Sequence, residues 1–495
     1  MSRALKLPKT LVAGLFVLYG VLANQTFALA EVYVLQGEQG KSGSNINQEL
    51  LTYLQSLKKY LKVEEPAKRL LVSGADLQIV NGSGQTSTSN GTGNLIVGYN
   101  EIRSGATFSS RKGSHNLVIG SGHAYDSAGG IVAGKDNTIT GVYASILGGQ
   151  NNTASGDGTS VLGGRSNEAK GEVSTVSGGE KNTSSGKAAS VAGGLSNKSS
   201  GSHAFAAGGN HNEAVGIYSS ALGGGSEEPK FGNSAYGPYS TTIGGTNNWA
   251  GEPLKGETPN PLLGVKSTVV GGNNNEASGI FSVILGGHGN KTTSTQNVVV
   301  GGLRNTADGN TTSIFGGVSN ITSGYGSSVI GGTKNSASGS AATICGGDRN
   351  RATGGDSTVC GGLENVASDH NSLVVGGWKN TASGPDSVIC GGYGNIADGD
   401  ESTVTGGEQN QATGYRASVL GGYKNIAAGL HSTVVGGTQN TSGNPQTPSI
   451  PSKPEAPGEK ATILGGQKNT ATGKRTNVIG SNNKSATQDD QTVSP

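Results

Sequence analysis

The 495-residue chain is poor in the residues that build a large globular core. Aromatic residues make up 5% and hydrophobic residues 32% of it, and it has two tryptophans and one methionine. So little apolar bulk cannot offset the conformational entropy lost on ordering one core of this length. The composition therefore disfavours a single large domain and favours many small cores in series.

A strong charge of either sign is also missing. Formal net charge is +2, and Arg3, Lys6 and Lys9 lie in the first 30 positions, which contain no acid. The rest of the chain has 32 basic against 33 acidic residues and is about neutral. We therefore expect neither nucleic acid nor an anionic membrane surface as a partner.

Motifs that carry chemistry are scarce too. The seven histidines show no metal-ligand pairing, and no nucleophile elbow, phosphate loop or zinc motif stands out. The run Asp398-Gly399-Asp400-Glu401 has few other carboxylates near it in sequence, whereas calcium takes about six or more oxygen ligands, so we interpret it as a solvated turn. We expect no enzymatic activity, no metal and no cofactor.

One apolar run suggests export. A basic segment at 1–9 precedes the apolar stretch 10–23 and the small-residue cleavage site Ala28-Leu29-Ala30. This order predicts a signal peptide over 1–30 and a secreted or cell-surface protein, with a retained signal anchor as the alternative. The run is short for a membrane span and no second one follows, so we expect no integral membrane segment after cleavage.

Glycine is what the chain has in abundance, 88 residues in a fixed period. Gly-Gly pairs recur mostly every 15 residues between Gly148 and Gly466, and single-glycine versions, some 14 residues apart, extend the series to 24 marked turns. Each unit reads as two short strands joined by tight glycine corners. The sequence thus predicts an all-β fold, a parallel β-solenoid or β-roll of 14- and 15-residue turns, roughly 115 Å long at about 4.8 Å per turn.

Asparagine marks one corner of the repeat. It lies four residues after the first glycine of the pair in 19 of the 20 Gly-Gly units. Its amide can bond both the corner backbone and the copy in the next turn, which predicts a structural corner ladder. Members of this ladder are Asn152, Asn167, Asn182, Asn197, Asn275, Asn290, Asn305, Asn320, Asn335 and Asn350.

The strand before each Gly-Gly pair has two adjacent apolar columns. One contains Val269 and Ile284, and the next contains Val270 and Leu285. Neighbouring strand residues point to opposite faces, so one column can fill the coil while the other is left in need of a partner. The inner column of the second strand is mostly alanine, which predicts a thin coil. The pattern predicts association of chains without fixing their number.

The N-terminal part differs from the repeats. After the signal peptide, residues 31–68 read as a leader and a short helix in which Leu50, Leu54, Leu57 and Leu61 have coiled-coil spacing. Such a helix is either a short oligomerising clamp or a single amphipathic helix packed on the first coil.

The repeat domain is predicted over 69–484, followed by a polar tail at 485–495. Its period is broken by inserts at 225–240, 252–265 and 443–459. Insertions in a solenoid emerge as surface loops, which either bind partners or have no function and are tolerated by the fold.

All three cysteines lie in the second apolar column. Cys345 and Cys360 fall on adjacent turns, about disulfide range for their Cα atoms, and the odd count with Cys390 also permits bonds between chains. Because valine and leucine fill the same column elsewhere, we expect buried thiols that act as small hydrophobes.

Large side chains follow the Gly-Gly pair in several nearby turns, at Leu363, Trp378, Tyr393 and Tyr423. Stacked aromatics at a corner can bind a glycan or another fibre, which makes these four residues the candidate partner-binding site. Packing between subunits explains them as well.

The repeat resembles the head repeats of YadA-like trimeric autotransporter adhesins, over roughly 94–484. Thr159-x-Val161-x-Gly163 and Asn167-x-Ala169-x-Gly171 match the two half-motifs of those repeats, with one extra glycine in each unit. The resemblance implies a left-handed β-roll, three chains side by side, and adhesion to a host, cell-surface or matrix ligand. Such autotransporters end in a membrane-embedded barrel segment, whereas this sequence ends in a polar stretch, so we expect a released or peripherally held fibre.

We therefore predict a non-enzymatic extracellular structural or adhesive fibre that forms a homotrimer. An ice-binding solenoid is the first alternative, because Thr268, Thr343, Thr358, Thr403 and Thr433 recur in one column, although serine, valine and leucine interrupt it. A polysaccharide-binding or polysaccharide-cleaving β-helix is the second; the cleaving form needs a cluster of acids or bases across turns, and the aligned columns show none.

Overall fold

The structure is a computed structural model that describes residues 43–64, 67–103, 110–228, 232–251, 264–445 and 458–495. The chain divides into two units, Met1–Gln78 and Ile79–Pro495. The predicted signal peptide at 1–30 and the leader up to residue 42 lie outside the described residues.

The first unit contains helix α2 (Gly43–Lys58) and an antiparallel hairpin of β1 (Leu61–Glu64) and β2 (Arg69–Val72). The helix stops before the fourth leucine of the predicted seam, because Leu61 pairs with Val72 in the hairpin instead. The expected coiled-coil spacing is therefore continuous only over the first three leucines. Leu50 and Leu54 remain 38% and 41% exposed, so the apolar side of α2 is open.

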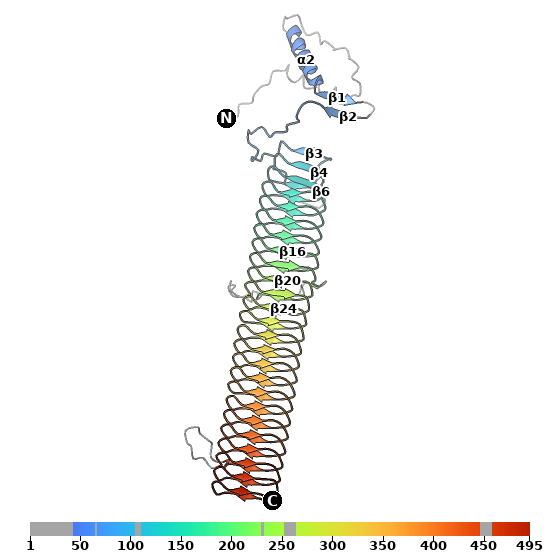
Figure 1. Cartoon of the computed structure of the whole chain (residues 1–495). Helices are drawn as coiled ribbons and strands as arrows, with labels where there is room; N and C mark the ends of the chain where they lie inside the picture. The colour runs from blue at the N-terminus through green and yellow to red at the C-terminus, as the bar shows by residue number, and fades with distance from the viewer. Residues whose placement is uncertain (1–42, 65–66, 104–109, 229–231, 252–263, 446–457) are drawn as a thin grey trace. The chain divides into compact units, whose positions relative to one another are not determined.

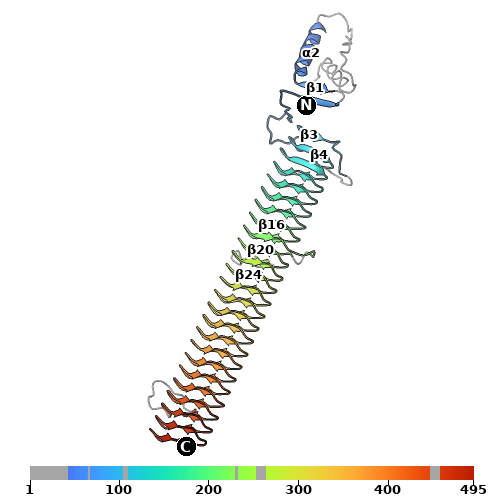
Figure 2. The same cartoon turned by 45° about the vertical axis from the view of Figure 1, so that its right-hand side comes forward.

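The second unit is a parallel β-solenoid, which confirms the predicted fold class. Figures 1 and 2 show its turns stacked one on another from β3 to the C-terminus. Each turn contributes one strand to each of two sheets, and each strand pairs in parallel with its equivalents in the neighbouring turns, as Thr343 does with Thr358. Within the described residues, sheet 1 has 25 strands and sheet 2 has 23.

Sheet 1 is formed by the strand that precedes each glycine corner. Its strands are β3 Leu95–Val97, β4 Leu117–Ser121, β6 Ile131–Lys135, β8 Ser145–Ile146, β10 Ser160–Val161, β12 Thr175–Val176, β14 Ser190–Val191, β16 Phe205–Ala207, β18 Ser220–Leu222, β20 Thr241–Ile243, β22 Thr268–Val270, β24 Val283–Leu285, β26 Val298–Val299, β28 Ser313–Ile314, β30 Ser328–Val329, β32 Thr343–Ile344, β34 Thr358–Val359, β36 Leu373–Val374, β38 Val388–Ile389, β40 Thr403–Val404, β42 Ser418–Val419, β44 Thr433–Val434, β46 Thr462–Ile463, β48 Asn477–Val478 and β50 Thr492–Val493.

Sheet 2 is formed by the short strand after that corner. Its strands are β5 Ala124–Tyr125, β7 Thr138–Ile139, β9 Thr153–Ala154, β11 Glu168–Ala169, β13 Thr183–Ser184, β15 Lys198–Ser199, β17 Glu213–Ala214, β19 Ser234–Ala235, β21 Trp249–Ala250, β23 Glu276–Ala277, β25 Lys291–Thr292, β27 Thr306–Ala307, β29 Ile321–Thr322, β31 Ser336–Ala337, β33 Arg351–Ala352, β35 Val366–Ala367, β37 Thr381–Ala382, β39 Ile396–Ala397, β41 Gln411–Ala412, β43 Ile426–Ala427, β45 Thr441–Ser442, β47 Thr470–Ala471 and β49 Ser485–Ala486.

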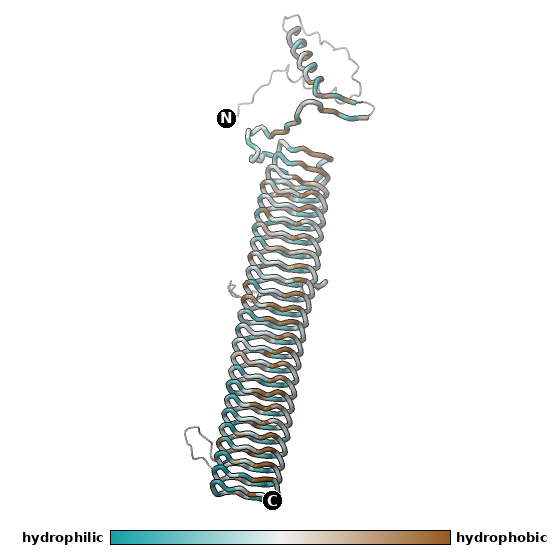
Figure 3. Tube along the Cα trace, viewed as in Figure 1, coloured by the Kyte–Doolittle hydropathy of each residue, from teal (hydrophilic) through white to brown (hydrophobic). Residues whose placement is uncertain are grey.

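A narrow apolar core runs between the two sheets, and Figure 3 shows its hydrophobic residues recurring turn after turn. The inward residue of sheet 1 is mostly valine or isoleucine, such as Ile344, and that of sheet 2 is mostly alanine, such as Ala352; both are fully buried. The core column is interrupted at Thr242, which occupies a valine position and divides the core into two clusters. Each strand thus contributes one side chain to the core, which is why a chain with few apolar residues can form it.

The asparagine ladder holds the first corner together. Asn350 donates from Nδ2 to the carbonyl oxygens of Gly346 (2.9 Å) and Gly362 (3.0 Å), and its Oδ1 accepts the N–H of Asn365 at 2.9 Å. The ladder asparagines are fully buried. In the unit where the sequence pattern lacks this asparagine, Asn233 takes the place, so the ladder continues across the first insert.

Close stacking explains two of the glycines found in most turns. The second glycine of the pair, such as Gly347, has φ +87°, and a Cβ there would lie 2.2 Å from the carbonyl oxygen of Gly362. At the second corner, a Cβ on Gly354 would lie 2.0 Å from the carbonyl oxygen of Asp369. A Cβ at Gly347 or Gly354 would therefore crowd the backbone of the next turn.

The boundaries of the solenoid differ from those expected. Regular strands continue past residue 484 through β49 and β50, because residues 485–495 keep the repeat pattern without its Gly-Gly pair. The inserts are also shorter than predicted. Ladder asparagines across the three inserts are 21, 27 and 29 positions apart instead of 15, and the flanking parts of 225–240, 252–265 and 443–459 form regular strands or corners.

Candidate partner-binding surfaces

The outer face of sheet 1 is the largest distinctive surface of the solenoid. We define it as the first and third residues of each sheet 1 turn, such as Ser313 and Phe315, which flank a buried residue and point outward. Among the described residues of these two columns, from Leu95 to Ser494, none is charged.

The third-residue column of this outer face is apolar and open to solvent. Leu147, Phe315 and Ile330 are 54%, 55% and 52% exposed. Its other large, exposed members are Val97, Ile119, Leu162, Ile243, Val270, Leu285, Val375, Leu420, Val435, Leu464 and Ile479. The predicted second apolar column is therefore not covered by its own chain, and it forms a stripe along the length of the solenoid.

Charged residues are concentrated elsewhere, on sheet 2 and at the corners. Lys198 and Glu213 pair at 2.9 Å across neighbouring turns of sheet 2. At the second corner, Arg416 lies 2.7 Å from Glu401 and holds the pKa of that carboxyl below its usual range by hydrogen bonding to it. Exposed pairs of this kind add little stability, so what matters here is where the charges lie. They leave one face of the rod polar and the other uncharged.

The first glycine of the Gly-Gly pair directly follows the apolar column. In nine units this glycine is outside the left-handed region, and a Cβ built on it would meet nothing within 4 Å. They are Gly163, Gly178, Gly331, Gly346, Gly361, Gly376, Gly391, Gly406 and Gly436. In these nine units neither backbone conformation nor packing within the chain requires glycine, so this edge of the solenoid is bare.

The three cysteines were expected to be buried, and that expectation is wrong. Cys345, Cys360 and Cys390 are free thiols and all three are exposed, because they belong to the outward column of sheet 1. Burial and the neighbouring Cys345 thiol raise the pKa of Cys360 above its usual value. Alternation along the strand, which was clear in sequence, did not by itself say which of the two apolar columns faces inward.

The predicted aromatic site forms a run at the first corner. Leu363, Trp378 and Tyr393 bridge consecutive turns, while Glu408 separates Tyr423 from them. The Trp378 and Tyr393 ring centroids are 4.7 Å apart at an interplanar angle of 43°, and Trp378 is 44% exposed. Three of the four residues thus make one contiguous apolar patch, and Tyr423 lies two turns beyond it.

Sequence reasoning missed a second aromatic stack, at the other corner. His203 and Tyr218 stack with ring centroids 4.7 Å apart, and Tyr218 and Tyr239 at 5.1 Å. Both tyrosines are about half exposed and have positive φ angles. Aligning the turns on the second corner would have revealed them, since the three residues hold the same position in successive turns.

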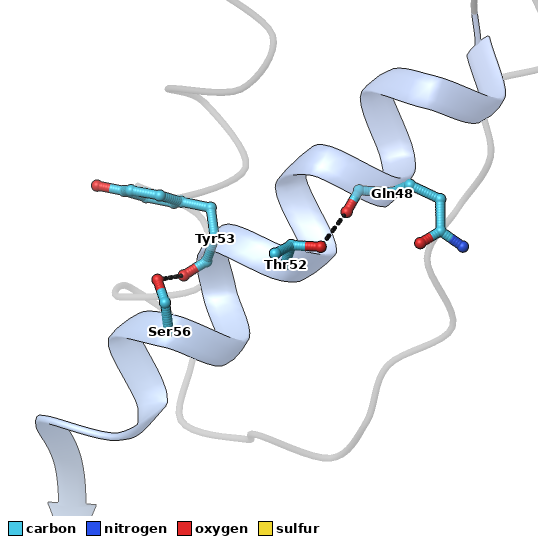
Figure 4. A pocket seen from close by; sticks show the side chains of 4 residues that line it. All are labelled: Gln48, Thr52, Tyr53 and Ser56. Atoms are coloured by element: carbon cyan, nitrogen blue, oxygen red, sulfur yellow. Dashed lines mark hydrogen bonds between the residues drawn. The ribbon is translucent and has the colours of Figure 1, made fainter.

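A shallow hollow lies beside α2 in the first unit, and Figure 4 shows the residues that line it: Gln48, Thr52, Tyr53 and Ser56. Thr52 donates to the Gln48 carbonyl at 2.9 Å and Ser56 to the Tyr53 carbonyl at 2.7 Å, so both hydroxyls serve the helix backbone. These four residues provide no acid, base or nucleophile arranged for catalysis.

Within the described ranges, no group of three or more histidine, cysteine, aspartate or glutamate side chains is placed to hold a metal ion. The part of the chain that the structure describes also has no helix long and apolar enough to span a membrane. No protein-family model matches the chain, and no curated protein matches it at a significant level.

Proposed function

We propose that this protein is a non-enzymatic extracellular fibre, structural or adhesive, in which several copies associate side by side through the outer face of sheet 1. The observation that carries the proposal is this face itself: two columns without charge, one of them apolar and about half exposed, running the length of the solenoid. A contiguous apolar patch of this extent is rare on a monomer and is typical of an association surface.

The size of the face supports a stable interface. At about 4.8 Å per turn and a width of about 10 Å, 25 strands present roughly 1,200 Å². Stable protein interfaces bury about 800 Å² on each partner. One face is therefore large enough for a lasting contact with an elongated partner.

A second copy of the chain is the occupant that fits best. Another copy has the same strand spacing, so its side chains can interdigitate with this face at every turn. The bare first glycines next to the apolar column give the two backbones room to approach. The resemblance to trimeric adhesin heads leads us to propose three chains, and the export signal predicted at 1–30 leads us to propose secretion or display at the cell surface.

We place the ligand-binding site of the adhesive fibre at the first corner. Leu363, Trp378 and Tyr393 form a contiguous, partly exposed apolar run there, of the kind that binds sugars or another fibre. Replacing Trp378 and Tyr393 by alanine is expected to abolish binding to a glycan array or to cells while leaving the mass of the assembly unchanged.

Sedimentation of the purified chain tests the association. We expect the mass of three chains, and we expect Phe315→Lys with Ile330→Lys to yield monomers, because the added charges would be buried against a neighbouring chain. Ile321→Lys with Ile396→Lys is the matched control, since both residues lie on the outer face of sheet 2. A wild-type monomer at micromolar concentration, or equal dissociation of the control variant, would refute the proposal.

An ice-binding surface is the second candidate, because the uncharged face also carries threonine or serine in most turns of its first column, one strand spacing apart. Phe205, Val283, Val298 and Leu373 interrupt that column, and Phe315 projects beside it. Thermal hysteresis by a monomeric chain would favour this function over the fibre.

A further inference from the structure

Two of the three thiols are held side by side in a single chain. Cys345 and Cys360 follow Ile344 and Val359, which pair in register in neighbouring strands of sheet 1. The N–H of Cys345 donates to Val359 O at 3.0 Å and that of Cys360 to Val374 O at 2.9 Å, so ladder hydrogen bonds fix both backbones. Both thiols point to the same exposed face.

The strand spacing decides what this pair can do. Paired parallel strands lie about 4.8 Å apart, and equivalent side chains in them run parallel. The Cα spacing lies within the disulfide range, but a disulfide also needs sulfurs about 2.05 Å apart and Cβ atoms about 3.8 Å apart, closer than parallel side chains on this ladder hold them. A zinc–thiolate bond is about 2.3 Å, so an ion of similar bond length midway between two thiolates needs sulfurs about 4.6 Å apart, close to the strand spacing of about 4.8 Å.

The surroundings select the kind of ion. The neighbours of the pair along its own column are Ile330 and Val375, and the adjacent outward column places Thr343 and Thr358 beside it. No carboxylate is present on this face to attract a hard cation, and thiolate ligands favour soft ions, among them Cu(I).

We propose that Cys345 and Cys360 form a two-thiolate site for a soft monovalent cation of the Cu(I) type, bound between two successive turns of sheet 1. Binding replaces two S–H bonds by two S–Cu bonds and releases two protons, leaving a complex of net charge −1, with no electron transferred. Because both thiols must lose their protons to bind, affinity falls as pH falls. Both ligands come from one chain, so no second copy is needed to complete the site, although it lies in the column that the proposed association would cover.

Cys390 provides an internal control. It belongs to the same column, but the strand that leads to Val375 lies between it and Cys360, so the two thiols are two strand spacings apart, about 9.6 Å. That distance exceeds what one ion can bridge.

The experiment is a Cu(I) titration of the reduced full chain without oxygen, in competition with a coloured Cu(I) chelator. We expect one tightly held Cu(I) per chain, with affinity at least about 100-fold weaker in Cys345→Ser and in Cys360→Ser and unchanged in Cys390→Ser. Circular dichroism checks that each variant keeps its β-structure, and sedimentation of the same samples reports on association separately.

Two results would overturn the site. Equal and additive losses of Cu(I) binding in all three cysteine variants would show that each thiol binds copper independently. Rapid conversion of the wild-type pair to an intrachain disulfide by oxidised glutathione, with loss of two hydrogens from the mass, would show that the ladder lets the sulfurs close and does not hold them at metal-bridging distance. Sedimentation of the same samples tests the proposed fibre separately.

Discussion

Removing one rung of the asparagine ladder should weaken the solenoid locally and strongly. Asn350→Ala deletes two donated hydrogen bonds and one accepted hydrogen bond, all in the interior. The Gly362 carbonyl keeps the N–H of Asp348 as a donor, but the N–H of Asn365 loses the acceptor on which it depends. Two lost bonds at about 1 kcal/mol each and a buried orphan donor at about 1–3 kcal/mol give a local loss of about 3–5 kcal/mol.

Amide hydrogen exchange is the suitable assay, because a stacked repeat opens locally and a single global free energy is not well defined for it. Exchange of the Asn365 amide should accelerate by about 100-fold or more, since each 1.4 kcal/mol corresponds to a factor of about ten. The Asn425 amide, several turns away, should be unaffected.

Arg351→Ala is the matched control, because this neighbouring side chain is exposed on sheet 2 and its loss should change exchange little. Asn350→Asp should lie in between at low pH, since its protonated side chain retains an acceptor oxygen and one donor. If Asn350→Ala protected the Asn365 amide as well as wild type does, the ladder would be a consequence of stacking and not a cause of it.

Three further outcomes follow from buried groups. Thr242→Val should stabilise its own turn and the adjacent turns by about 1–2 kcal/mol, seen as slower exchange of their amides, because the Thr242 hydroxyl is buried without a hydrogen-bond partner; unchanged or faster exchange would contradict this. Ile389→Ala should cost about 2–5 kcal/mol in the same assay by opening a cavity in the single-file core, and a loss below about 1 kcal/mol would mean that the turns collapse around it. Burial lowers the pKa of His123, whose Nδ1 accepts the Asn137 N–H at 3.2 Å. Just below pH 6.5, the ordinary pKa of histidine, the unfolded imidazole therefore gains a proton while the folded one stays neutral. Stability of the first turns should therefore fall as pH drops through 6.5, seen as faster exchange of the Asn137 amide, and His123→Asn should remove this dependence.

Most of the fold is determined by the short segment that repeats along the chain. The 15-residue period, the glycine corners and the asparagine at a fixed offset are each properties of one short segment, and stacking only multiplies them. That is why the parallel solenoid, the small alanine core column and the position of the ladder could be predicted from the residues alone. The aromatic run at Leu363, Trp378 and Tyr393 was also visible, because equivalent positions in successive turns must be neighbours.

What the sequence could not determine depended on long-range pairing or on the choice between two faces. Leu61 has helical spacing, yet it pairs with Val72 in an antiparallel hairpin. A partner that far along the chain cannot be inferred from the local spacing of leucines. The exposure of Cys345 and Cys360 required knowing which apolar column faces the core.

The absence of charge across the outer face of sheet 1 likewise became visible only when two columns, separated in every turn by a buried residue, were found side by side. Only the stacked backbone showed that the second glycine of the pair is required by its neighbour, whereas in nine units the first is not. A repeat fixes what each turn does by itself; the surfaces that many turns share arise from packing, and only the tertiary structure decided them.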